Sequence, residues 1–161
     1  MRGSCFDPTY IIESSGPGLV ANDIRVQNAA YGYLVFRPKN ARMAAGAGTC
    51  AKMMFDIHCR NQNMTYSLGG AIMSLFGRDR GSLSRSDFDA LFEQIISGSK
   101  HQYFCSQFVV YIYQFVAEQL NIPARTVFPY LDAKVSPSKL AMDLAGNSNF
   151  SEAGYLMPHE R

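Results

Sequence analysis

The longest apolar segment of the chain runs from residue 104 to residue 120. It contains no glycine or proline, and apolar side chains recur around most of the circumference that a helix here would have. Such a segment is too long for one strand, and apolar character on all sides is typical of a buried helix. Its β-branched and aromatic residues form helices poorly, so tertiary burial must stabilise it. The pattern therefore predicts a core helix.

Shorter patterns predict the strands. Residues 10–14 and 31–37 are rich in β-branched and aromatic side chains and are bounded by glycine or proline. We expect these two strands to pair in an antiparallel sheet that packs against the core helix, with residues 19–28 as an irregular connection. Residues 150–157 are a further candidate strand. Along the strand at residues 10–14, Glu13 points to the face opposite Ile12.

Three further helices are predicted. Asn40 is an N-cap candidate for a helix over residues 40–60. Gly46 and Gly48 each lower the stability of this helix by about 1 kcal/mol relative to alanine, or they allow a neighbouring element to pack closely. Residues 86–96 are amphipathic. Residues 136–145 begin with a serine in the N-cap position and proline at the first helical position. Strands, then helices, then a last strand give an α+β fold in a single domain spanning residues 1–161.

Composition restricts the partners. The formal net charge is +2 and the basic residues are scattered, so no nucleic-acid partner is expected. No apolar run approaches eighteen residues, so no transmembrane segment is predicted. The N-terminus lacks the apolar stretch of a signal peptide, which gives a cytoplasmic location as the default. No phosphate-binding loop is present, and no cofactor is expected.

The four cysteines are widely spaced. Cys5, Cys50, Cys59 and Cys105 form no Cys-x-x-Cys pair, so neither a disulfide framework nor a metal site is predicted, and all four are expected to be free thiols. Cys105 falls in the first turn of the predicted core helix. Unpaired backbone N–H groups and the helix dipole favour a thiolate there, but small buried cysteines are also common. Position alone leaves both interpretations open.

Four segments, in order, resemble one known family. They are residues 10–16 (Tyr-Ile-Ile-Glu-Ser-Ser-Gly), 33–38 (Tyr-Leu-Val-Phe-Arg-Pro), 104–109 (Phe-Cys-Ser-Gln-Phe-Val) and 135–140 (Val-Ser-Pro-Ser-Lys-Leu). Together they are similar to the circularly permuted branch of the NlpC-type papain-like superfamily, which includes permuted papain-like amidases and lecithin:retinol acyltransferase-like enzymes. The resemblance implies a small antiparallel sheet packed on a buried helix that carries the cysteine at its N-terminus.

The resemblance also implies a reaction. Cys105 would be the nucleophile of a thiol hydrolase or acyltransferase, which forms an acyl-enzyme on a peptide, amide or lipid-like acyl substrate with an amide, ester or thioester bond. A histidine would accept the proton, and Glu13 would be the acid that orients the histidine. Two alternatives remain: a non-catalytic binding module of the same fold, or a small interaction protein in which Cys105 belongs to the core.

The histidine is where the chain departs from the family. In the family it lies on a strand before the glutamate strand, but no histidine precedes Glu13 here. His58 lies near the end of the helix predicted over residues 40–60, where we expect it to be exposed, and His159 lies in the C-terminal tail. His101, four residues before Cys105, is the remaining candidate base. Either the chain is truncated at its N-terminus, or the protein keeps the fold without turnover. We therefore expect weak or no turnover from this chain as given.

Overall fold

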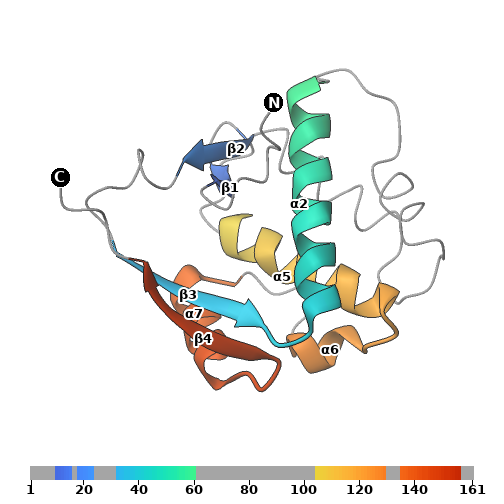
Figure 1. Cartoon of the computed structure of the whole chain (residues 1–161), viewed down its shortest axis with the longest axis vertical. Helices are drawn as coiled ribbons and strands as arrows, with labels where there is room; N and C mark the ends of the chain where they lie inside the picture. Colours follow the sequence, from blue (N-terminus) through green and yellow to red (C-terminus); the bar gives the residue numbers. More distant parts are fainter. Residues whose placement is uncertain (1–9, 16–17, 24–31, 61–103, 130–134, 157–161) are drawn as a thin grey trace.

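The computed structural model describes residues 10–15, 18–23, 32–60, 104–129 and 135–156, and its elements confirm the predicted α+β class (Figure 1). The elements are β1 (Tyr10–Ser15), β2 (Gly18–Asp23), β3 (Tyr33–Pro38), α2 (Ala41–Arg60), α5 (Phe104–Gln119), α6 (Ala124–Val127), α7 (Pro137–Gly146) and β4 (Phe150–Leu156). The predicted helix over residues 86–96 lies outside the described residues.

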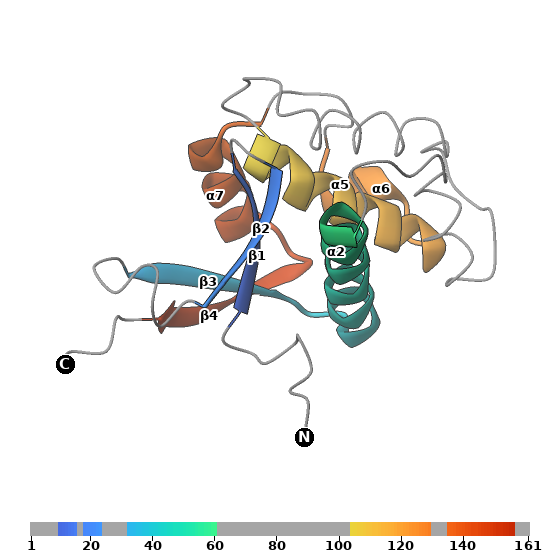
Figure 2. The ribbon, with the colours of Figure 1, turned by 90° about the horizontal axis from the view of Figure 1, so that it is seen from above.

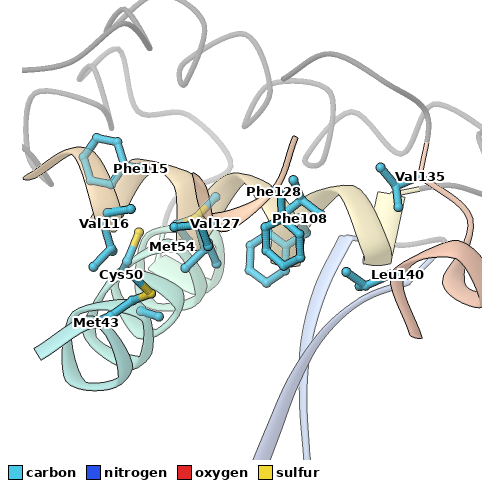
Figure 3. Packing of buried hydrophobic residues seen from close by; sticks show 14 of the residues in the cluster. Met43, Cys50, Met54, Phe108, Phe115, Val116, Val127, Phe128, Val135 and Leu140 are labelled. Atoms are coloured by element: carbon cyan, nitrogen blue, oxygen red, sulfur yellow. The ribbon is translucent and has the colours of Figure 1, made fainter. Parts of the chain in front are cut away.

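The core helix is confirmed as α5. Its side chains Phe108, Phe115 and Val116 are at most 3% exposed and pack with Met43 and Met54 of α2 in one apolar cluster (Figure 3). Burial in this cluster compensates for the poor helix propensity of the aromatic and β-branched residues. None of the helices in the described ranges is long and apolar enough to cross a membrane.

The end of α5 is closed by a Schellman motif. Asn121 has a φ of +60°, in the left-handed region that asparagine tolerates better than most residues. The N–H of Ile122 donates to the carbonyl of Ala117 at 2.8 Å, and the N–H of Asn121 donates to the carbonyl of Glu118 at 2.9 Å. These bonds satisfy two carbonyls that a helix end leaves without partners. The chain therefore turns away before Pro123 and begins α6.

The predicted pairing of the strands is wrong. β1 pairs with β2, and β3 pairs with β4, in two separate antiparallel ladders. Residues 19–23, which we expected to lie in an irregular connection, belong to β2 instead. Ser15 pairs with Gly18, so only two residues join β1 to β2. Figure 1 shows the β1–β2 ladder above β3–β4, and Figure 2 gives the view from above.

Each ladder reaches the core by one face. Ile12 of β1 packs against the core cluster, and Leu19 of β2 is part of it, 2% exposed. The expected packing of the Glu13 strand on the cysteine helix is confirmed, because β1 contacts α5. From β4, Phe150 meets the ring of Tyr113 edge-on at 5.2 Å between centroids. The helices α2 and α5 therefore hold the two ladders together.

Local capping signals in the sequence are confirmed. The side-chain oxygen of Asn40 accepts hydrogen bonds from the backbone N–H groups of Arg42 at 2.9 Å and Met43 at 3.2 Å. Ser136 caps α7 by accepting from the N–H of Lys139 at 3.2 Å. A Cβ added at Gly48 would meet nothing within 4 Å, so this glycine does not serve close packing.

Candidate functional site

Cys105 lies at the start of α5, as predicted. It is the second residue of the helix as described, and its side chain is half-buried. Its sulfur lies 3.9 Å from the hydroxyl of Ser106, a side chain that is only 3% exposed. The thiol thus lies at the boundary between the core and the surface, while the helix continues into the core behind it.

The inner side of this part of α5 is apolar. Figure 3 shows Val135 and Leu140 beside the pale yellow N-terminal part of the helix, close to Phe108. All three side chains are buried, at 2%, 8% and 3% exposed, and α7 contacts α5 here. The segment preceding and beginning α7, which carried part of the family resemblance, therefore supports the helix that carries Cys105.

Glu13 is half-buried on β1, and its carboxylate accepts a hydrogen bond from the side-chain amide of Asn22 on β2. Asn22 pairs with Ile11 in the ladder register, so the two polar side chains are diagonal neighbours on one face. Ile12 faces the other way, into the core. No hydrogen bond joins Glu13 to Cys105 in the part of the chain that is described.

Asn22 is the polar partner that the sequence interpretation missed. It was hidden because residues 19–28 were expected to be irregular, which removed any reason to look for a cross-strand pair. The available signal was the short apolar run of Leu19, Val20 and Ala21 between Gly18 and Asn22, which is consistent with a short strand bounded by turn residues.

The structure does not assign a base. His101 and His159 lie outside the described residues. His58 lies on α2, but its side chain is also outside what is described. Within the described ranges, no group of three or more His, Cys, Asp or Glu side chains could hold a metal ion.

The other thiols provide a reference for Cys105. Cys50, Cys59 and Cys105 are all free, as predicted, while Cys5 lies outside the described residues. Cys50 is 0% exposed in the middle of α2, and burial raises the pKa of its thiol to about 12. Cys59 is exposed near the end of the same helix. The three described thiols therefore occupy three different environments.

Comparison of the chain with protein-family models, with curated proteins and with solved structures finds no match.

Proposed function

We propose that the protein is a thiol hydrolase or acyltransferase of the permuted papain-like type, with Cys105 as its nucleophile. One observation carries the proposal: Cys105 lies in the first described turn of a core helix and is half-buried rather than enclosed. A helix start offers N–H groups and the positive end of the helix dipole, which favour a negatively charged sulfur. The contact between α5 and β1 supports the permuted fold, whereas the separation of the two ladders departs from the single sheet that we expected.

The reaction has two steps. The sulfur of Cys105 attacks a carbonyl carbon, forming a carbon–sulfur bond, while the bond from that carbon to the leaving nitrogen, oxygen or sulfur breaks. The leaving group takes up a proton. Water, or an acceptor amine or hydroxyl, then attacks the thioester, and the thiol is regenerated. Glu13 is the proposed orienting acid, held by Asn22, and His101 is the candidate base.

Trapping of the acyl-enzyme tests the proposal. The full chain is incubated with p-nitrophenyl acetate, quenched in acid and mapped by mass spectrometry. We expect an acetyl group on Cys105 and none in Cys105→Ala, and we expect the exposed Cys59 to acetylate more slowly. Cys59→Ala is the matched control and should leave acylation of Cys105 unchanged. Equal acetylation of Cys59 and Cys105 would contradict the proposal.

One observation favours a second candidate, a non-catalytic binding module of the same fold. Glu13 has an amide, Asn22, as its partner, on the ladder face opposite Ile12. A nucleophile–histidine–acid relay needs two hydrogen bonds in series, each of about 2.6–3.2 Å. If Cys105 is acylated but the acyl-enzyme is never resolved, and His101→Ala changes nothing, the binding module is the better description.

A further inference from the structure

Two polar side chains are buried on α5: Ser106 is 3% exposed and Gln114 is 0% exposed. Burial of a polar group costs free energy unless the group is hydrogen-bonded. Gln114 has a structural bond, because its side-chain amide donates to the carbonyl of Phe128 at 3.1 Å and so ties α5 to the end of α6. Among the described residues, the Ser106 hydroxyl makes no such bond to another element. Its burial therefore needs a different explanation.

The hydroxyl of Ser106 has the sulfur of Cys105 as its partner, at 3.9 Å. The two residues are adjacent in sequence but differ in burial, since Cys105 is half-buried at the start of α5. Val110, one helical turn after Ser106, is 2% exposed and lies on the same side of the helix. The hydroxyl thus approaches the sulfur from the core side of α5.

The strength of this contact depends on the charge of the sulfur. A neutral thiol is a weak hydrogen-bond partner, which fits the long separation of 3.9 Å. Hydrogen bonds to a charged atom are shorter and stronger. In the proposed reaction the sulfur carries negative charge before it attacks the carbonyl carbon, and again when the carbon–sulfur bond of the acyl-enzyme breaks. A donor beside the sulfur stabilises these states more than it stabilises the neutral thiol.

We propose that Ser106 is a positioning residue for Cys105: its buried hydroxyl orients the sulfur and donates a hydrogen bond to it when the sulfur is negatively charged. The hydroxyl keeps its own proton throughout, so Ser106 is neither the nucleophile nor the base. A donor that burial already holds in place needs little reorganisation when charge develops. The role in acyl transfer rests on the proposed function, whereas the hydrogen bond itself is measurable without turnover.

Alkylation of three thiols in the full chain tests the hydrogen bond. The unaltered protein and Ser106→Ala are labelled with limiting iodoacetamide at neutral pH, and peptide mapping gives the rates at Cys105, Cys59 and Cys50. Ser106→Ala should slow the labelling of Cys105 about fivefold. A hydrogen bond to a charged group is lost, but a less stabilised thiolate is a better nucleophile, which offsets about half of the loss. The rates at exposed Cys59 and buried Cys50 should stay unchanged, whereas a general loosening of the core would raise the labelling of Cys50.

Two further variants separate the hydroxyl from the stability of the helix. Ser106→Thr keeps the hydroxyl and should recover most of the lost rate at Cys105. Ala117→Gly weakens α5 at a position that is 0% exposed and far along the helix from Cys105, and it should leave the rate at Cys105 unchanged. Thermal unfolding verifies that each variant is folded. An unchanged rate in Ser106→Ala, an equal fall in Ala117→Gly, or no recovery in folded Ser106→Thr would overturn the inference.

Acetylation by p-nitrophenyl acetate distinguishes failure of this inference from failure of the proposed function. We expect the unaltered chain to acetylate Cys105, and Ser106→Ala to do so about fivefold more slowly. If both acetylate Cys105 at the same rate, the proposed function stands and the role of Ser106 fails. If the unaltered chain does not acetylate Cys105 but Ser106→Ala still slows its alkylation, the hydrogen bond stands and the proposed function fails.

Discussion

The middle of α2 and the start of α5 place the same side chain in opposite settings. Cys50 is 0% exposed, with Met43 and Met54 in the same buried cluster, and burial raises the pKa of its thiol to about 12. Cys105 is half-buried beside the hydroxyl of Ser106, in the first turn of its helix. Both helices belong to one core.

The difference follows from position along a helix. In the middle of a buried helix the backbone N–H groups are already hydrogen-bonded within the helix, so none is free to stabilise a thiolate at Cys50. Burial then disfavours the charged form of this thiol. At the first turn, free N–H groups remain, and the chain has just entered the core. The comparison indicates that Cys50 is a packing residue, and it supports our proposal that Cys105 is the reactive thiol. The predictions below test the two halves of this contrast.

The largest expected effect is protection of Cys50 from alkylation. In the native protein, Cys50 should react with iodoacetamide at least about a thousandfold more slowly than in the unfolded chain, because reaction requires opening of the core. Peptide mapping after timed labelling, with and without denaturant, measures this ratio. Labelling of Cys50 at a rate comparable to that of exposed Cys59 would show that the core around α2 is not closed.

Stability should fall at alkaline pH because of Cys50. Its folded pKa of about 12 lies above the ordinary value of 9.0 for a cysteine thiol. The stability that Cys50 contributes to the folded state is therefore fully present below pH 9 and is lost as the pH rises from 9 to 12. In that window the free energy of unfolding should fall by about 1.4 kcal/mol per pH unit from this group. Burial also raises the pKa of Tyr113, which acts in the same direction.

Denaturant unfolding at several pH values measures this slope. Cys50→Ala removes the titrating group, so the fall in unfolding free energy should be smaller by about 1.4 kcal/mol per pH unit, which corresponds to one proton. Cys105→Ala is the comparison variant at the other site. An unchanged slope in Cys50→Ala would show that other groups cause the alkaline loss.

Replacement of each thiol by a hydroxyl should separate the two sites further. Cys50→Ser places a hydroxyl in an apolar cluster and should cost about 1–3 kcal/mol of unfolding free energy. Cys105→Ser, at the edge of the core, should cost less than about 1 kcal/mol. Urea unfolding of both variants gives the two values, and equal costs would remove the structural basis of the comparison.

The smallest expected effect is a gain in stability on α2. Gly48 lies inside the helix, and a Cβ there meets nothing within 4 Å. Gly48→Ala should therefore raise the free energy of unfolding by about 0.5–1 kcal/mol through better helix propensity. It should leave the alkylation rate of Cys105 unchanged. A loss of stability would indicate that the glycine has a role that this geometry does not show.

Local signals in the sequence were sufficient for several elements. The cap at Asn40, the Ser-Pro start of α7 and the apolar circumference of α5 each depend on a few neighbouring residues. Pairing of the strands depends on contacts between distant segments, and there the prediction was wrong. The short connection after Ser15 makes β1–β2 a hairpin, which leaves β3 to pair with β4 from the end of the chain.

The candidate site was predictable to a similar extent. A cysteine at the start of a core helix follows from sequence, because both the helix and its start are local features. The Glu13–Asn22 pair does not, because it requires the register of a ladder that had not been recognised.

The most direct test of the central claim compares Cys105 with Cys59 in the same molecules. Cys59 is exposed and provides an internal standard for an ordinary thiol. Native protein is labelled with a limiting amount of iodoacetamide over a range of pH, and peptide mapping gives the ratio of the two rates. The account predicts that Cys105 reacts faster than Cys59 near neutral pH, because the start of a helix stabilises negative charge that develops on the sulfur. A ratio at or below one throughout that range would contradict it and leave Cys105 a packing residue like Cys50.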